Sequence, residues 1–389
     1  MNRILIKNGK LVLPDKTIKS NIIAENGKII EVGNREIDNC VVIDAEDKIV
    51  TPGLIELHAH GAGGSDFCDC SVPAFETVVK THLQHGVTLI CPTAVSCSFE
   101  RLIKLFDVLR NVKNGKFGQY IHKLHLEGPF LNKLQCGAQR KDLIRCPLKE
   151  EVDILLDRGA DIIGRIGCAP EIEGIDYLAK TAKNKGILLS IAHSAATAEQ
   201  TKKALDIGFT HITHLYSATT TVRKIGQKIY AGILEAAYLY DDFYIELIGD
   251  GKHVAKETLQ LAIKIKDSEK INLTSDSMRA AGMIEVTESY LGDIAPENRV
   301  IIDDGVAKLP DMSSYAGSIA TGDLMLKNAV ENYGISVTDA VKMLSLTPAK
   351  IIGVEKRKGS IETGKDCDIV LWNKDYTVYS ILKNGIRIN

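Results

Sequence analysis

The sequence predicts an α/β protein: a (β/α)8 TIM barrel with a small β-sandwich domain built from both termini. Two observations lead to this prediction. In the middle of the chain, eight short apolar runs alternate with amphipathic helical stretches, which is the pattern of parallel β/α construction. The two ends instead carry short β-branched runs separated by turns. The segment 52–345 is close to the usual barrel length of about 250 residues.

The terminal segments predict antiparallel strands joined by hairpins. Asn8-Gly9 and Asn26-Gly27 are turn signals between β-branched runs, and Asn384-Gly385 repeats this style near the other end. We therefore expect 1–51 plus 346–389 to form one small β domain and 52–345 to form the barrel. The strands expected in the small domain lie at 4–6, 11–13, 22–24, 29–32, 41–43, 360–361, 368–372 and 378–382.

The barrel segment can be divided into alternating elements. The predicted strands lie at 54–57, 88–92, 123–127, 162–168, 187–193, 210–214, 244–247 and 272–276. The predicted helices lie at 74–84, 102–112, 150–156, 176–184, 199–207, 256–264, 323–332 and 337–345. Thr197 and Thr338 stand where helix N-caps belong. The segment 286–309 is longer than a simple connection, so we expect an inserted β-hairpin there.

Composition narrows the class of protein. The formal net charge is −2, so nothing favours binding to nucleic acid or to a membrane surface. No apolar run approaches the roughly 20 residues of a membrane span, and the start of the chain turns polar too early for a secretory signal. Nine cysteines show no disulfide-like framework, which fits a reducing cytoplasm. Cys68 and Cys70 are close together in sequence, but the chain has no second such pair of cysteines. We assign them a loop or packing role.

Polar residues fall at the ends of five predicted strands. His58 and His60 are spaced i, i+2, so in an extended strand their side chains point to the same side. In a barrel, the carboxyl ends of the strands converge on one mouth. Any one of these residues could be a cap or a satisfied core histidine, but packing alone does not explain why all of them fall on one face. The six candidates are His58, His60, Glu127, His193, His214 and Asp276.

These residue types indicate metal-assisted hydrolysis. Histidine and carboxylate ligands suit Zn²⁺ or Fe²⁺ better than Mg²⁺. An incomplete protein ligand set leaves a position for water, whose pKa a bound Zn²⁺ lowers to about 7. If the histidines and Glu127 suffice as ligands, Asp276 is the candidate to take a proton from that water and pass it to a leaving group.

The motifs carry a resemblance to a known family. His58-Ala59-His60, histidines on the fifth and sixth strands and an aspartate on the eighth are similar to the amidohydrolase superfamily, barrels flanked by a small β domain. A narrower resemblance, covering about residues 45 to 350, is to the N-acetylglucosamine-6-phosphate deacetylases. The motifs that carry it are His125-Leu126-Glu127-Gly128-Pro129, Ala169-Pro170-Glu171, Thr213-His214-Leu215-Tyr216, Asp250-Gly251-Lys252-His253, Asp276-Ser277-Met278-Arg279 and Ala316-Gly317-Ser318.

This resemblance implies roles for individual residues. Glu127, His193 and His214 are expected to hold the main ion, and Asp276 is expected to be the proton shuttle. His58 and His60 match members that hold a second ion bridged through Glu127, so one or two ions are expected. Around the substrate, the implied contacts are His253 to the sugar or its phosphate, Ala138 lining the sugar site, and the backbone of Tyr315, Ala316 and Gly317 closing over it.

The implied reaction is removal of the N-acetyl group of N-acetylglucosamine 6-phosphate, giving glucosamine 6-phosphate and acetate. The partners are then a small amino-sugar phosphate substrate and, in a homodimer, a second copy of the chain. No nucleic acid or membrane partner is expected.

The sequence departs from the family pattern near the expected phosphate site. Ser217 and Ala218 stand where members commonly continue Asn-Ala. Arg223, with Lys224 behind it, is the phosphate candidate, although a solvated basic turn is the alternative. Gln139 replaces a substrate-contacting histidine of many members.

Other functions stay open at this point. The substrate could be another N-acetyl amino sugar, either galactosamine 6-phosphate or an unphosphorylated sugar. Another amidohydrolase, such as an N-acyl amino acid hydrolase or cyclic amidase, is a second reading, but the fourth strand lacks the lysine that many of those enzymes carboxylate. A non-catalytic scaffold is the third, and such a protein is expected to have lost ligands that this chain keeps.

Overall fold

The structure is a computed structural model that describes residues 3–388. The chain divides into two compact units, one made of Met1–Glu56, His82–Leu89 and Thr321–Asn389 and the other of Leu57–Thr81 and Ile90–Ala320. These units group residues by packing. The predicted boundaries, 1–51 plus 346–389 and 52–345, group residues by strand and helix pattern and stay a prediction.

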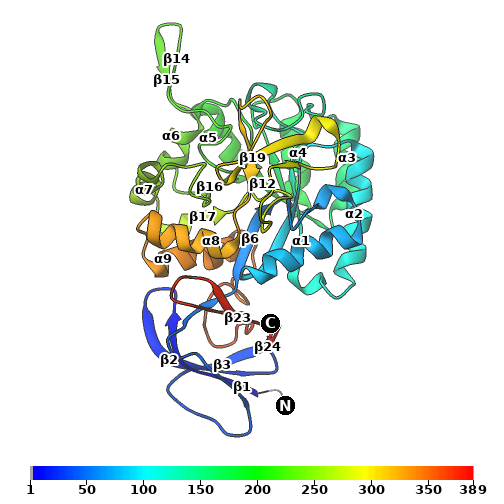
Figure 1. Cartoon of the computed structure of the whole chain (residues 1–389). Helices are drawn as coiled ribbons and strands as arrows, with labels where there is room; N and C mark the ends of the chain where they lie inside the picture. The colour runs from blue at the N-terminus through cyan, green and yellow to red at the C-terminus, as the bar shows by residue number, and fades with distance from the viewer. Residues whose placement is uncertain (1–2, 389) are drawn as a thin grey trace. The chain divides into compact units, whose positions relative to one another are not determined.

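A separate sheet combines the two ends of the chain, as predicted (Figure 1). Its order is β24-β23-β22-β5-β1-β2-β3, and β4 pairs with β1. The ends of the chain meet where β22 pairs antiparallel with β5. Its strands are β1 (Arg3–Val12), β2 (Thr17–Glu25), β3 (Lys28–Gly33), β4 (Val41–Asp44), β5 (Ile49–Pro52), β22 (Ile369–Trp372), β23 (Val378–Lys383) and β24 (Ile386–Arg387).

Two details of this sheet differ from prediction. Asn8-Gly9, predicted as a turn, lies inside β1, where the register shifts between Ile6 and Gly9 and Asn8 has a φ of 65°. The pair therefore makes a bulge within one long strand, a left-handed position that asparagine tolerates. The predicted strand at 360–361 is irregular, and Ile361 packs into the core instead.

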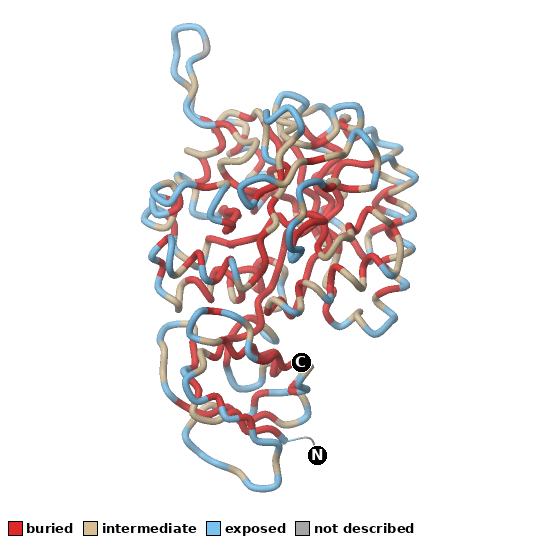
Figure 2. Tube along the Cα trace, viewed as in Figure 1, coloured by how far each residue is buried: buried red, intermediate tan, exposed pale blue. Residues whose placement is uncertain are grey.

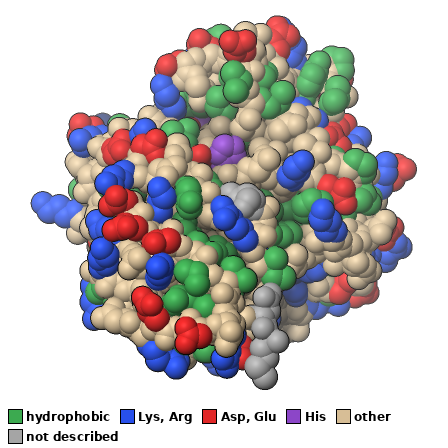
Figure 3. All heavy atoms as spheres, turned by 60° about the horizontal axis from the view of Figure 1, so that its bottom comes forward, with side chains coloured by type: hydrophobic (Ala, Val, Ile, Leu, Met, Phe, Trp, Pro, Cys, Tyr) green, Lys and Arg blue, Asp and Glu red, His purple; other side chains and the backbone are tan. Residues whose placement is uncertain are grey.

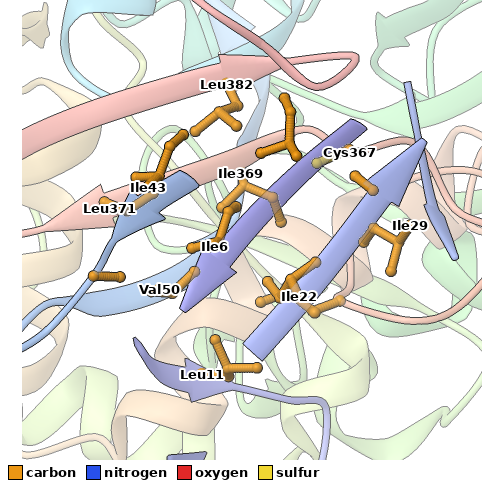
Figure 4. Close-up of a cluster of buried hydrophobic side chains, with 14 residues drawn as sticks. Ile6, Leu11, Ile22, Ile29, Ile43, Val50, Cys367, Ile369, Leu371 and Leu382 are labelled. Atoms are coloured by element: carbon orange, nitrogen blue, oxygen red, sulfur yellow. The ribbon is translucent and has the colours of Figure 1, made fainter. Parts of the chain in front are cut away.

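The core of the sheet domain is drawn from both termini (Figure 4). Ile6, Leu11 and Ile22 come from the N-terminal strands, and Ile369 and Leu371 come from β22. All five are fully buried. Burying a side chain of this size stabilises a fold by about 1.5–3 kcal/mol, so neither end of the chain completes this core alone.

The second sheet is the predicted eight-stranded parallel barrel (Figure 1). The spatial order, β17-β16-β13-β12-β11-β10-β9-β6, follows the chain, and a bridge between Ala59 and Ser277 links the first and last strands. The tube in Figure 2 is mostly red along these strands because most of their residues are buried. The strands are β6 (Leu54–Ala59), β9 (Val87–Ala94), β10 (Leu124–Glu127), β11 (Ile163–Cys168), β12 (Leu188–Ile191), β13 (Phe209–Ile212), β16 (Tyr244–Ile248) and β17 (Ile271–Thr274).

The helices confirm most of the sequence pattern. They are α1 (Val72–Gln84), α2 (Phe99–Lys113), α3 (Lys149–Gly159), α4 (Ile175–Asn184), α5 (Ala198–Ile207), α6 (Ile233–Leu239), α7 (Lys256–Ile265), α8 (Gly322–Lys327), α9 (Val337–Val341) and α10 (Thr347–Ile351). Thr197 caps α5 as predicted, in a capping box with Gln200. The prediction for Thr338 is wrong, because Ser336 caps α9 by accepting from the Asp339 N–H.

Two antiparallel insertions interrupt the barrel pattern. The predicted hairpin is β19 (Arg299–Asp303) and β20 (Val306–Lys308), widened into four strands by β18 (Glu288–Tyr290) and β21 (Tyr315–Ser318). A second hairpin, β14 (Arg223–Ile225) and β15 (Lys228–Tyr230), was not predicted. It extends away from the barrel in Figure 1 and is largely exposed in Figure 2.

Among the helices of residues 3–388, none is long and apolar enough to cross a membrane. Acidic and basic side chains are interspersed on the face shown in Figure 3, in keeping with the net charge of −2. All nine cysteines carry free thiols.

Candidate active site

The six polar residues predicted at the strand ends come together in the structure. His58 lies in β6 with His60 just beyond it, and Glu127 is the last residue of β10. His193, His214 and Asp276 were predicted as the last residues of their strands, but β12, β13 and β17 each end two residues earlier. There the φ angles are 45°, 29° and 47°, left-handed conformations that are costly for residues other than glycine and cluster at functional sites.

Glu127 stands at the centre of this cluster, with one histidine pair at each carboxylate oxygen. Oε1 lies 2.7 Å from His214 Nε2 and 3.2 Å from His193 Nε2. Oε2 lies 3.3 Å from His60 Nε2 and 3.6 Å from His58 Nε2. In each of the two groups, the three candidate ligand atoms lie within 4.8 Å of one another. The geometry is that of two adjoining ligand sets that share Glu127.

The hydrogen bonds of the histidines show that these residues fit a cation. His193 Nδ1 lies 2.8 Å from the Gln135 carbonyl oxygen, and His214 Nδ1 lies 3.1 Å from that of Ser217. A carbonyl oxygen can only accept, so each Nδ1 carries a hydrogen, and in the neutral ring the lone pair lies on Nε2. Those lone pairs face a carboxylate oxygen at 2.7–3.2 Å. Positive charge balances such an arrangement, and with neutral rings a divalent ion held by these atoms would supply it.

The shifts in the pKa values of Glu127 and His60 show how the charges in this cluster act on one another. Burial raises the pKa of Glu127, but His58, His193 and His214 together lower it well below its usual range. Burial lowers the pKa of His60, but Asp276 and Glu127 raise it to about 9. The site therefore holds its carboxylates ionised and favours added positive charge.

Asp276 faces the centre from the His58 and His60 side. Its Oδ1 lies 3.2 Å from His60 Nε2 and 3.3 Å from His58 Nε2. Burial raises its pKa, but these two histidines lower it below the ordinary value. An ionised carboxylate in this position can accept a proton.

Gln139 supports Glu127. Its Oε1 accepts from the Ser96 N–H at 2.7 Å, and its Nε2 donates to Glu127 Oε2 at 2.8 Å. The backbone bond to Ser96 fixes which end of the amide faces Glu127. A role for Gln139 in holding this carboxylate could not be read from the sequence, because nothing along the chain pairs it with Ser96.

A cavity of about 770 Å³ opens over the cluster. Two other pairs orient its walls: His253 Nδ1 lies 2.7 Å from Asp250 Oδ2, and the His253 ring stacks edge-on against Tyr315 at 4.8 Å. The predicted residues that line the cavity are His60, Glu127, Ala138, Gln139, His193, His214, Ser217, Ala218, His253, Asp276, Tyr315 and Gly317.

Three predicted residues do not line this cavity. His58 is fully buried beneath it, and Ala316 packs in the core of the β18–β21 insertion. Arg223 lies on β14 and donates from Nη2 to the Ala195 carbonyl oxygen at 2.7 Å. Two cations that the sequence reasoning passed over, Arg140 and Lys141, line the cavity instead.

Two further residues under the cluster were also missed. Arg165 on β11 and Glu246 on β16 are buried inside the barrel, and Glu246 contacts His58. The signal that could have found them is a charged residue in the middle of an otherwise apolar strand, as in Tyr244-Ile245-Glu246-Leu247-Ile248.

Fold and site together define a metal-dependent hydrolase of the barrel class, because a shared carboxylate between histidine pairs at a barrel mouth is a metal-ligand arrangement. The chain belongs to the amidohydrolase family, whose sequence model matches residues 49–387.

Several proteins that this chain resembles in sequence are deacetylases. It is 32% identical over 365 residues to the N-acetylglucosamine-6-phosphate deacetylase of Haemophilus influenzae, covering 92% of each chain. It is 28% identical over 390 residues to that of Bacillus subtilis, covering 98% of this chain and 96% of the relative. An N-acetylgalactosamine-6-phosphate deacetylase of Escherichia coli O157:H7 is 27% identical over 345 residues, covering 88% of this chain and 89% of the relative.

Solved structures of deacetylases are also similar to this chain. The N-acetylglucosamine-6-phosphate deacetylase of Pasteurella multocida superposes with a TM-score of 0.91 at 27% identity, covering 99% of each chain. An aspartate-to-alanine mutant of the Mycobacterium smegmatis enzyme, in complex with N-acetyl-D-glucosamine-6-phosphate, has a TM-score of 0.89 at 25% identity, covering 100% of this chain and 99% of the other.

Proposed function

We propose that this chain hydrolyses the N-acetyl group of N-acetylglucosamine 6-phosphate to give glucosamine 6-phosphate and acetate. The observation that carries the proposal is the Glu127-centred histidine cluster with Asp276 beside it, at the floor of a cavity of about 770 Å³. The deacetylase relatives match this chain over nearly its whole length, which supports the choice of substrate.

The chemistry follows from the side chains around the centre. A divalent ion held by Glu127 and the histidines would supply Lewis acidity for a carbonyl oxygen and would lower the pKa of water toward 7. Asp276 Oδ1 accepts the proton that the attacking water gives up and passes it to the departing nitrogen as the carbon–nitrogen bond breaks. The amine then leaves neutral, and the acetic acid formed with it loses its remaining proton to solvent to give acetate. Gln139 holds Glu127 in place, and Glu127 contacts both histidine pairs.

The proposed cofactor is one or two divalent ions, the first held by Glu127, His193 and His214 and the second by Glu127, His58 and His60. Zn²⁺ or Fe²⁺ is proposed, because imidazole and carboxylate ligands suit both. The lone pairs directed at Glu127 support an ion in the first set. The short distance of 3.2 Å between His58 Nε2 and His60 Nε2 supports one in the second.

The phosphate of the substrate has two proposed contacts. Arg223 is proposed from the resemblance, and Lys141 is proposed from its position on the cavity wall. Lys141 is exposed, on a turn after Gln139. An amine at the cavity rim provides a point charge for phosphate, while an arginine provides a bidentate fork.

We also propose that the protein works as a homodimer in the cytoplasm. The free state of all nine cysteines supports a reducing compartment. Light scattering on the purified chain tests the dimer, which a monomer mass contradicts.

Acetate release from a panel of sugars tests the proposed function. Zn²⁺- or Fe²⁺-loaded protein is given N-acetylglucosamine 6-phosphate, N-acetylgalactosamine 6-phosphate and unphosphorylated N-acetylglucosamine. We expect the first to be cleaved with the highest kcat/KM. Preference for the galactosamine epimer supports the second candidate, for which the Escherichia coli O157:H7 relative is the reason. No release from any sugar refutes both.

A further inference from the structure

The barrel interior beneath the histidine cluster holds a buried ion pair. Arg165 on β11 is 5% exposed and Glu246 on β16 is 0% exposed, and Nη1 of the arginine lies 3.0 Å from Oε2 of the glutamate. A barrel interior is usually filled by branched apolar side chains. Removing two charges from water is expensive, and apolar residues often replace such a pair without loss of stability. The position of this pair therefore calls for a reason other than stability.

The second oxygen of Glu246 supplies that reason. Oε1 lies 2.7 Å from His58 Nδ1. The carboxylate is the acceptor, so Nδ1 carries a hydrogen, and in the neutral ring the lone pair lies on Nε2. That Nε2 points to the centre, 3.2 Å from His60 Nε2 and 3.6 Å from Glu127 Oε2. A carboxylate behind a histidine ligand fixes its tautomer and ring orientation in metal sites.

Arg165 holds the other side of His58. Its Nη2 donates to the carbonyl oxygen of Leu57 at 2.9 Å, the residue just before His58. Nη2 also lies 2.8 Å from His125 Nδ1, and Nη1 lies 2.7 Å from His211 Nδ1. With acceptors from four neighbours, the guanidinium has one orientation. It fixes both the backbone that carries His58 and the carboxylate that binds its ring.

The other histidine pair has different support. His193 Nδ1 and His214 Nδ1 face backbone carbonyl oxygens of Gln135 and Ser217. On this side Glu246 meets backbone N–H groups: its Oε1 accepts from the His214 N–H at 3.3 Å, and its carbonyl oxygen accepts from the Leu215 N–H at 2.7 Å. Glu246 thus hydrogen-bonds to the ring of His58, whereas its bonds near the other pair are to backbone N–H groups.

We propose that Glu246 and Arg165 are positioning residues for the set formed by His58, His60 and Glu127 Oε2, and that they set its affinity for a second divalent ion. This inference rests on the proposed metal centre but not on the proposed substrate.

A titration without substrate tests it. Full-length protein is stripped with a chelator and titrated with Co²⁺, while visible absorption and the metal content per chain are recorded. We expect two ions on the wild type. In Glu246→Gln, the first ion binds as before and the affinity for the second falls 10–100-fold. The matched control is Glu257→Gln, the same change at an exposed position in the first turn of α7, which binds both ions.

Three results overturn the proposal: wild-type protein that saturates with one ion, a Glu246→Gln variant that binds the second ion as tightly as the wild type, or a variant that loses both ions together. If far-UV circular dichroism shows that Glu246→Gln does not fold, the double variant Arg165→Met/Glu246→Leu replaces the charged pair by apolar groups and is expected to lose only the second ion. If the protein cleaves no sugar, the proposed function is refuted, but the metal titration still tests this proposal because it uses no substrate.

Discussion

The substitution Asp276→Asn separates proton transfer from every other task of the site. Asparagine has nearly the same shape as aspartate and, like it, tolerates the left-handed backbone of this position, where φ is 47°. The backbone bonds from Asp276 N to His58 O and from Ser318 N to Asp276 O, at 3.0 and 2.8 Å, do not involve the side chain. We therefore expect the fold and the metal content to stay unchanged.

Turnover responds differently, because the amide cannot accept the proton that water gives up. Loss of a positioned general base costs typically 10²–10⁴-fold in rate, which corresponds to about 2.7–5.4 kcal/mol of barrier. We expect kcat to fall by that factor while KM changes little, because the ground-state contacts to the sugar remain.

The assay is steady-state acetate release with metal content measured on the same sample. Asp304→Asn is the matched control, since Asp304 also has a left-handed φ, 51°, and lies on the surface in an ion pair with Lys252. The reasoning is refuted if kcat of Asp276→Asn falls less than tenfold. Loss of metal from this variant means that Asp276 is a ligand and not the proton shuttle.

Three other predictions concern stability and substrate binding. Burial, aided by Lys113 and Lys123, lowers the pKa of His122 from 6.5 to about 4, so the unfolded chain takes up a proton before the folded one. The free energy of unfolding should therefore fall by about 3 kcal/mol between pH 6.5 and 4. If urea titrations show that the free energy of unfolding of His122→Gln falls with pH as steeply as that of the wild type, this prediction is wrong. Leu371→Ala, in the sheet-domain core, should cost about 2–5 kcal/mol, while the exposed Leu239→Ala should cost under 1 kcal/mol; equal costs would mean that the core is not packed as described. Lys141→Ala and Arg223→Ala should each raise KM for the phosphorylated sugar far more than for its unphosphorylated analogue, and a variant that changes both KM values equally removes that residue from the phosphate site.

Much of the fold could be predicted because burial leaves a direct trace in sequence. Each barrel strand is an apolar run, and Glu127 at the end of one run and the histidines at the ends of others converge by the geometry of a parallel barrel. The ends of three strands were misplaced. Nothing in His193, His214 or Asp276 marks the left-handed turn that each adopts, because tertiary contacts and not a local glycine impose it.

The remaining parts of the site depend on contacts between distant strands. Arg165 and Glu246 meet across the barrel, 81 positions apart in sequence, and Gln139 meets Glu127 only after the loop between them folds back. No short-range pattern encodes such pairs. The charged residues within apolar strands were visible in the sequence, but their partners were not.

Recovery of turnover in metal-free protein tests the central claim most directly. Chelator-treated protein is given increasing equivalents of Zn²⁺ or Fe²⁺, and acetate release from N-acetylglucosamine 6-phosphate is followed at each step. The account predicts no release without metal and a rise that saturates at one or two equivalents per chain. Full activity in the metal-free protein, or metal-loaded protein that releases no acetate, would contradict it.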